Sequence, residues 1–323
     1  MRKTWHDPFG LRSCKVCALI PNLMTPDPDG DISEILKRVR RIELKTRGLV
    51  RDGIAGEYHS CFKGSGIDFE DFREYQHGDE IRSIDWNVTA RMGDPFIKKF
   101  SEERDLTVFL IVDVSASGDY GSIEQSKREL AAEVAAVLAF SALQNKDKVG
   151  LILFSGDVQM VLPPKKGAGQ ILRVIREILH CKPTGNQTNP GEALKTLSNL
   201  AKRRCLAFLV SDFLFELTSE AVRSASAKHD LVAIQVSDPA EEKLPAAGVL
   251  RFLDPESGNH ALVNTSNPNI QHLYDQERAQ WQREVEAFFR KHKVDLIKVS
   301  TDPEQDYMAA LHAFFRQRER VQI

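Results

Sequence analysis

The sequence predicts an α/β fold with a doubly wound, mostly parallel sheet that has helices on both faces. Two observations predict this. Short apolar runs such as 108–112 and 206–210 are bounded by polar residues, as expected for strands buried on both faces. Segments with the apolar period of a helix, such as 123–144, separate these runs. This alternation is typical of parallel strands joined by right-handed crossovers.

The strands and helices of this domain follow in order from residue 105 onward. The predicted strands are 108–112, 149–154, 206–210, 231–236 and 295–299, with an antiparallel edge strand at 157–162. The predicted helices are 123–144, 168–180, 191–202, 219–228, 269–292 and 305–316. A short β excursion is expected at 249–253 and 261–263. The main domain therefore spans 105–323.

The chain before residue 105 divides into two further blocks. We expect 1–30 to be a poorly ordered tail or a mis-assigned start, with Met24 as the alternative start codon. The block 31–104 begins with an amphipathic helix at 31–47 and continues as a small β-rich region. Short, aromatic-rich pieces separated by glycines predict that region, namely 58–62, 69–75, 81–88 and 96–100.

The small β-rich region is dense in charged side chains. These are Arg73, Asp79, Arg82, Asp85 and Arg91, with Trp86 as the expected apolar anchor. Arginine is suited to bidentate contacts with carboxylates. The charged groups therefore either attach the region to the larger domain or form a partner-binding surface or anion pocket, and both interpretations stay open.

Composition is that of an ordinary soluble globular protein, and we expect it to be cytoplasmic. A net charge of -2 over 323 residues provides no general attraction to nucleic acid or anionic lipid, so no nucleic-acid partner is expected. No apolar stretch approaches the ~20 residues of a membrane span. The basic face of helix 31–47 could lie on a membrane or bind RNA, although pairing with acidic neighbours is commoner. Five scattered cysteines disfavour a disulfide framework.

Polar side chains follow the first strand of the predicted sheet. Asp113, Ser115 and Ser117 come directly after the apolar run 108–112. Ligands in open α/β sheets bind outside the carboxyl ends of the strands, so these side chains lie where a site is expected. Carboxylate and hydroxyl oxygens suit Mg²⁺ (or Mn²⁺) far better than zinc.

Two later residues complete a possible metal site. Thr188 lies in the polar loop before a predicted helix, and Asp212 follows a predicted strand. If the segments converge at one sheet edge, Ser115, Ser117 and Thr188 would bind Mg²⁺ directly. Asp113 and Asp212 would hold its waters and hydrogen-bond the hydroxyls. An open coordination position would then accept a carboxylate from a protein partner.

The pattern resembles the von Willebrand factor A fold and its metal-ion-dependent adhesion site, D-x-S-x-S followed by Thr and Asp. The resemblance implies that the ligand roles fall on Asp113, Ser115, Ser117, Thr188 and Asp212. Without it, the two serines would simply cap the following helix and Asp212 would end a strand.

A second resemblance covers the chain from about residue 31 onward. The segments R-E-Y at 73–75, G-D-E-I-R-S-I-D-W at 78–86 and T-A-R at 89–91 are similar to the bacterial family called domain of unknown function 58. Thr89 stands where Ser is usual. Members resemble von Willebrand A proteins and are typically associated with MoxR-type AAA+ ATPases. The resemblance implies a metal-dependent interaction module, an adaptor or cofactor of such an ATPase in assembly or chaperone-like remodelling.

An Mg²⁺-dependent phosphohydrolase is the enzymatic alternative. Haloacid-dehalogenase phosphatases use D-x-D-x-[TV], but here Ser115 stands where the second Asp, the general acid, would be. The sequence contains neither a P-loop nor a G-x-S-x-G nucleophile elbow. We therefore expect that the protein is not an enzyme and has no catalytic residues.

Overall fold

The computed structural model describes residues 32–62, 68–76, 78–101, 106–122, 125–184, 188–253 and 260–321. The chain forms two compact units, and each is described by itself. One unit is Phe62–Leu106, and the other comprises Met1–Cys61 and Thr107–Ile323. The predicted block 31–104 is therefore divided, because its first helix belongs to the larger unit.

The larger unit is built on a six-stranded sheet in the order β10-β7-β6-β3-β4-β5. All neighbours pair in parallel except β4 and β5, which are antiparallel. The strands are β3 (Thr107–Asp113), β4 (Lys148–Phe154), β5 (Val158–Lys165), β6 (Leu206–Ser211), β7 (Asp230–Ser237) and β10 (Asp295–Ser300). Each strand lies within a few residues of its predicted position, including the antiparallel edge strand, and the predicted fold class is confirmed.

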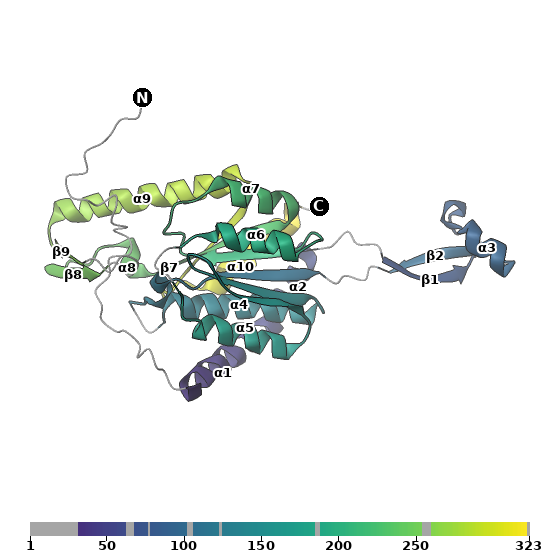
Figure 1. Cartoon of the computed structure of the whole chain (residues 1–323), viewed down its shortest axis with the longest axis horizontal. Coiled ribbons are helices and arrows are strands. Elements are labelled where there is room, and N and C mark those ends of the chain that lie inside the picture. The colour runs from purple at the N-terminus through teal and green to yellow at the C-terminus, as the bar shows by residue number, and fades with distance from the viewer. Residues whose placement is uncertain are drawn as a thin grey trace, which may run out of the picture. The chain divides into compact units, whose positions relative to one another are not determined.

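Helices cover both faces of this sheet (Figure 1). One face carries α4 (Lys127–Gln144) and α5 (Ala168–His180), with α1 (Ile32–Leu49) packed on both. The other face carries α6 (Pro190–Leu200), α7 (Ser219–Lys228) and α9 (Pro268–Lys291). The C-terminal α10 (Tyr307–Val321) packs on β10 and on α2 (Ala55–Cys61).

Double coverage explains why the strands are apolar without alternation. In β3, Phe109 and Ile111 join the core cluster shared with α6, α7 and α9. Val108, Leu110 and Val112 are also completely buried. Successive side chains of a strand point to opposite faces, so both faces must be apolar when both are covered.

Helix α4 begins at Lys127, four residues after its predicted start at 123. A capping box sets this boundary, because Ser126 accepts from the Glu129 backbone N–H while Glu129 accepts from that of Ser126. The helix is buried along almost its whole length, including the charged residues Lys127 and Arg128 of its first turn. These two charges lie at the carboxyl edge of the sheet.

A small excursion follows β7. It consists of α8 (Pro239–Glu242) and an antiparallel pair, β8 (Val249–Leu253) and β9 (His260–Asn264), as predicted for 249–253 and 261–263. Among the described residues, no helix is both long and apolar enough to cross a membrane. Cys61, Cys181 and Cys205 are free thiols.

The smaller unit pairs β1 (Asp68–Glu74) with β2 (Phe96–Ser101) and adds α3 (Trp86–Met92). Two of the four predicted β pieces are therefore correct. The pieces 58–62 and 81–88 are wrong, because they belong mainly to α2 and α3 and to the turn before α3.

Helical spacing explains the error at 58–62. Ile54, Tyr58, Cys61 and Phe62 recur at intervals of four, three and one residue, and all four are buried. Tyr58 packs edge-on against Phe315 of α10 and hydrogen-bonds Asp147 (3.3 Å). The aromatic content of this short segment concealed a helical period.

Candidate functional site

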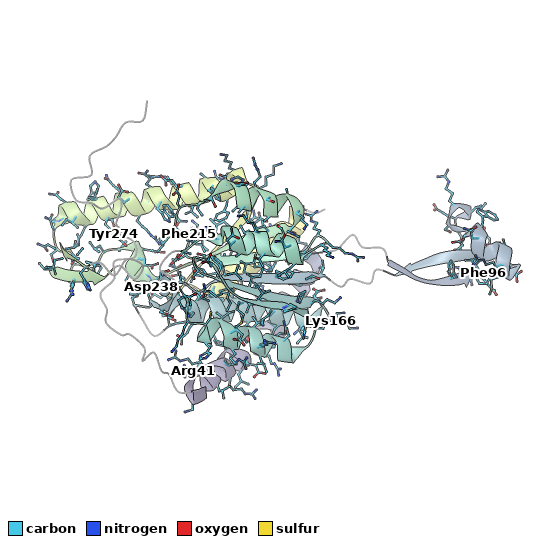
Figure 2. The ribbon with its side chains drawn as sticks, in the orientation of Figure 1. Arg41, Phe96, Lys166, Phe215, Asp238 and Tyr274 are labelled. Carbon is cyan, nitrogen blue, oxygen red and sulfur yellow. The ribbon has the colours of Figure 1, made fainter. Side chains whose placement is uncertain are left out.

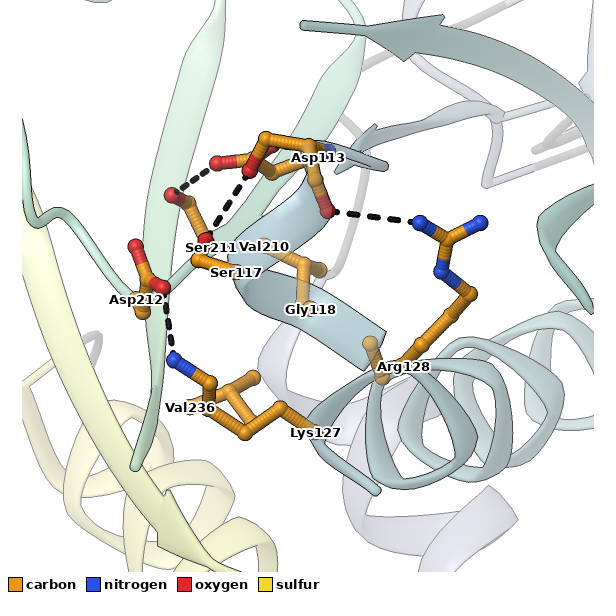
Figure 3. A pocket seen from close by; sticks show the side chains of 11 residues that line it. Asp113, Ser117, Gly118, Lys127, Arg128, Val210, Ser211, Asp212 and Val236 are labelled. Atoms are coloured by element: carbon orange, nitrogen blue, oxygen red, sulfur yellow. Dashed lines mark hydrogen bonds and ion pairs between the residues drawn. The ribbon is translucent and has the colours of Figure 1, made fainter. Parts of the chain in front are cut away.

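The candidate site lies where the order of the sheet reverses. From β3 the chain crosses to β4 on one side and later returns to β6 on the other side. The connections that follow β3 and β6 therefore run to α4 and α7 on opposite faces of the sheet, and the crevice between them is the usual ligand position in a doubly wound sheet. A pocket at this point is lined by Asp113, Ser115, Ser117, Gly118, Lys127, Arg128, Ala131, Val210, Ser211, Asp212 and Val236 (Figure 3).

Asp113 ends β3 and is held by hydrogen bonds on both carboxylate oxygens. The backbone N–H of Ser115 donates to Oδ1 (2.9 Å), and Ser211 Oγ donates to Oδ2 (2.7 Å). These neutral donors fix the carboxylate without neutralising its charge. Burial and the nearby charge of Asp212 raise the pKa of Asp113 to about 6.

The two serines of the pattern point toward one another. Ser115 Oγ and Ser117 Oγ form a hydrogen bond with each other (3.0 Å), and both residues are buried. Arg128 of α4 holds the backbone that carries them, because its Nη2 donates to the carbonyl of Val114 (2.8 Å). The same guanidinium donates from Nη1 to the carbonyl of Cys181 (2.6 Å).

Asp212 lies immediately after β6 and is paired with a buried lysine. Lys127 Nζ lies 2.7 Å from Asp212 Oδ2, and the Leu214 backbone N–H donates to Oδ1 (3.0 Å). Burial alone would raise the pKa of Asp212, but the charge and hydrogen bond of Lys127 outweigh it and hold that pKa below its ordinary value. The two carboxylates of the pocket therefore differ: Asp212 has an ion-pair partner, and Asp113 is held by neutral donors.

The backbone after Asp212 adopts an unusual conformation. Phe213 has a φ of 56°, a left-handed conformation that bulky residues rarely adopt. Its ring is completely buried and packs edge-on against Phe289 of α9, with ring centroids 4.9 Å apart. Core packing thus fixes the turn that directs Asp212 into the pocket.

Thr188 is half-buried and lies just before α6. It is not among the residues that line the pocket. The backbone N–H of the next residue, Asn189, donates to the carbonyl of Ser155 (2.8 Å), directly after β4. Because β4 is the neighbour of β3, this contact brings the Thr188 segment to the same edge of the sheet as Asp113.

The donors fit a small hard cation. The polar side-chain atoms of the pattern that line the pocket are all carboxylate or hydroxyl oxygens, the ligands that Mg²⁺ prefers. Two ligands roughly 2.0–2.1 Å from Mg²⁺ on adjacent octahedral vertices are about 3.0 Å apart. That is the separation of the two serine hydroxyl oxygens. No group of three or more His, Cys, Asp or Glu side chains that could hold a metal occurs among the described residues.

Sequence reasoning missed three polar residues of this site, Ser211, Lys127 and Glu241. Ser211 ends β6 and hydrogen-bonds Asp113. Lys127 contacts both Asp212 and the buried Glu241 of α8. Their positions depend on tertiary packing, although a lysine in the first turn of a helix that is mostly apolar after Glu129 is a signal that could have drawn attention to Lys127.

The charged residues predicted as an interaction surface lie in the smaller unit. Arg73 and Asp79 form a bidentate pair, with both contacts 2.8 Å long. This pair lowers the pKa of Asp79. Asp85 caps α3 by accepting from the backbone N–H groups of Asn87 and Val88. Each of these contacts lies within the unit.

Trp86, Arg82 and Arg91 of that unit are exposed. Within its unit 66% of Trp86 is exposed, and its role as an anchor between the two units stays a prediction. It occupies the first turn of α3 rather than a strand. A role of these three side chains in partner binding stays a prediction.

The fold and the arrangement of the pocket define the chain as a von Willebrand factor A-like α/β protein. The chain matches the family model described as "Protein of unknown function DUF58" over residues 71–285. Because this match covers most of the chain, the protein belongs to that family.

Over most of its length the chain is similar to mycobacterial proteins described as uncharacterized. The uncharacterized protein Rv1480 of Mycobacterium tuberculosis is 28% identical over 296 residues, which are 90% of this chain and 92% of the relative. The solved structure of BatB from Bacteroides thetaiotaomicron is 16% identical with a TM-score of 0.44, over 67% of this chain and 99% of that one. The SpRpn10 VWA domain is 12% identical with a TM-score of 0.36, over 64% and 94% respectively.

Proposed function

We propose that the protein is a cytoplasmic, metal-dependent protein-interaction module without catalytic activity. In this proposal Ser115, Ser117 and Thr188 hold Mg²⁺ or Mn²⁺ at the carboxyl edge of the sheet. The cation supplies an electrophilic position that can accept an Asp or Glu carboxylate from a partner. The observation that carries the proposal is the 3.0 Å separation of the two serine hydroxyl oxygens beside the Asp113 carboxylate.

The chain's own residues have distinct tasks in this proposal. Asp113 orients the loop through its bond to the Ser115 N–H and provides the local negative charge. Asp212 accepts a hydrogen bond from the Leu214 backbone N–H and forms an ion pair with Lys127 on the β6 side of the pocket. Such supporting contacts orient metal ligands and tune the ion. Few direct charges would leave the cation able to attract a further carboxylate.

The proposed partner is a MoxR-type AAA+ ATPase. This step rests on the resemblance of the chain to its family. The protein would act as an adaptor or cofactor that presents clients to the ATPase for assembly or remodelling. Acidic side chains on the partner would provide the carboxylate that completes the site.

Helix α1 is less suited to the alternative of a basic helix that binds membranes or RNA. Four basic residues of this helix are engaged with carboxylates. Arg40 and Arg47 contact the buried Glu43, Lys45 contacts Glu133 (2.6 Å), and Arg38 contacts Glu129 (3.3 Å). These pairs reduce the net positive charge that the helix would offer to phosphates.

The proposal is tested by binding of the organism's own MoxR-type ATPase to the full chain by biolayer interferometry, with Mg²⁺ and with EDTA. We expect binding in Mg²⁺ that EDTA abolishes and that Asp113→Ala weakens by at least about tenfold. Asp113→Ala should stay folded, because it removes a buried carboxylate that has no ion-pair partner among the contacts described above.

Asp275→Ala is the matched control. Asp275 is an exposed carboxylate of α9, far along the chain from the pocket residues, and its replacement should leave binding unchanged. Equal binding by wild type and Asp113→Ala, or binding that is indifferent to EDTA, would contradict the proposal. Salt-sensitive binding of RNA or vesicles lost on neutralising Arg38, Arg40 and Arg41 would instead support the basic-helix alternative.

A further inference from the structure

A buried lysine bridges the candidate site and the excursion that follows β7. Lys127 is 2% exposed, and its Nζ lies 2.7 Å from Asp212 Oδ2 and 2.5 Å from Glu241 Oε1. Both carboxylates are themselves buried. Figure 3 shows the lysine, from the first turn of α4, reaching the carboxylate of Asp212. Its ammonium therefore lies beside any cation that the pocket takes up.

Glu241, the second partner of Lys127, is itself held in place by further contacts. Glu241 Oε2 accepts from the Asp238 backbone N–H in the capping box of α8. The carbonyl of Glu241 accepts from Tyr274 Oη of α9 (2.7 Å). Tyr274 and the N-cap residue Asp238 are labelled in Figure 2. Asp238 in turn accepts from Thr301 Oγ1 (2.7 Å). Apart from Lys127, Glu241 is thus held by the cap of its own helix α8 and by Tyr274 of α9, which restrains its movement if the pair with the lysine is loosened.

The charges of the cluster make the lysine a competitor of a divalent ion. Charges a few ångströms apart in a buried site interact strongly, because solvent screens them little. One ammonium beside Asp212 repels a second cation and also occupies one oxygen of that carboxylate. An additional carboxylate brought by a partner would offset this repulsion.

We propose that Lys127 is a positioning residue and a resident counter-cation that keeps the site's affinity for a divalent ion low until an acidic partner binds. This inference rests on the proposed function. It assigns a regulatory role to that site: the metal and the partner carboxylate bind together, and each strengthens the binding of the other. Glu241 modulates the effect, because it shares the charge of Lys127 with Asp212.

The test measures Mn²⁺ binding to the full chain without any partner, at pH 8, by the electron paramagnetic resonance signal of free Mn²⁺. Lys127→Met should bind Mn²⁺ on the order of tenfold more tightly than wild type, because a nearby positive charge is removed. Glu241→Gln should bind it several-fold more weakly, because the charge of Lys127 then acts on Asp212 and the metal undiminished. Opposite signs distinguish this role from a structural one, in which both variants would weaken binding.

A charge-balanced variant guards against misfolding. Lys127→Met alone leaves two buried carboxylates without their partner, which can prevent folding. Lys127→Met combined with Glu241→Gln removes one charge of each sign, and it should bind Mn²⁺ more tightly than Glu241→Gln alone. Lys45→Met is the matched control. Lys45 lies in α1 and pairs with the buried Glu133 of α4, which is not among the pocket-lining residues. This substitution should leave Mn²⁺ affinity unchanged.

The outcomes separate this inference from the proposed function. If wild type shows no Mn²⁺ binding that Asp113→Ala removes, the proposed function fails and this inference fails with it. If that binding is present but removing Lys127 does not raise the affinity in either background, only the role of Lys127 is overturned. Tighter binding in both lysine variants, with weaker binding in Glu241→Gln, supports it.

Discussion

Single residues of the pocket have opposite electrostatic environments. Asp113 accepts from neutral donors, and burial raises its pKa to about 6. Asp212 is paired with Lys127, which holds its pKa below the ordinary value. Two carboxylates on adjacent strands thus respond differently to an approaching cation. The tests of Asp113 and Lys127 set out above address these two residues separately.

His229 allows a further prediction at the scale of one residue. It is 1% exposed, and its Nδ1 lies 3.2 Å from the Sγ of Cys205. Burial lowers the pKa of His229 from its ordinary value of 6.5. A depressed pKa in the folded state means that the histidine's contribution to stability is present above pH 6.5 and is lost as the pH falls below it. We expect the free energy of unfolding to decline over that range.

His229→Gln should flatten this decline by up to about 1.4 kcal/mol per pH unit, as measured by urea unfolding between pH 7.5 and 5. His260→Gln is the control, because His260 of β9 is exposed and its replacement disturbs no buried side chain. An identical pH profile for wild type and His229→Gln would show that the buried ring does not contribute to acid sensitivity.

At the scale of one element, α4 decides where Lys127 and Arg128 lie. Both charges occupy its first turn, directly after the N-cap Ser126. Arg128 bonds the carbonyls of the loop that carries the serines, and Lys127 reaches the opposite wall of the pocket. A shift in the start of α4 by one residue would rotate both side chains by about 100° around the helix. The capping box is therefore part of the site's geometry.

Ser126→Ala should lower the free energy of unfolding by about 1 kcal/mol, the usual effect of losing an N-cap, as measured by urea denaturation. Ser224→Ala in α7 is the control, because Ser224 is an exposed serine inside a helix and alanine is the better helix former there. A loss as large in Ser224→Ala as in Ser126→Ala would argue against a specific role of the cap.

At the scale of the whole molecule, the winding of the sheet creates the crevice and places one carboxylate on each side of it. The pocket lining contains two carboxylates, Asp113 and Asp212. Both oxygens of Asp113 already accept hydrogen bonds, and Lys127 and the Leu214 backbone N–H contact those of Asp212. Each of the two carboxylates is therefore already held by contacts within the chain on both of its oxygens.

We therefore expect no turnover of p-nitrophenyl phosphate above the buffer rate, with Mg²⁺ or with Mn²⁺. The experiment includes Asp113→Ala to separate the pocket from traces of contaminating phosphatase, whose activity that substitution would not change. Turnover that disappears in Asp113→Ala would contradict the non-enzymatic proposal and favour the phosphohydrolase.

Much of the larger unit could be predicted from the sequence, because its signals are local. A strand buried on both faces is a continuous apolar run, and the helices between such strands keep their apolar period. Five residues were predicted as one group. Asp113, Ser115, Ser117 and Asp212 line one pocket, whereas Thr188 is not among its lining residues. Errors fell on short pieces such as 58–62, where packing on α10 selects a helix.

The sequence alone determined the fold class, the order of the strands along the chain and the oxygen-rich character of the site, because all three depend on residue type and spacing. Only the tertiary structure decided which charges meet. Lys127, Asp212 and Glu241 are separated by 85 and 29 residues along the chain, and they come together because α4, β6 and α8 meet at one edge of the sheet. Long-range contacts between buried charges leave no periodic signal in a sequence, so the counter-cation of the site became visible only in the folded molecule.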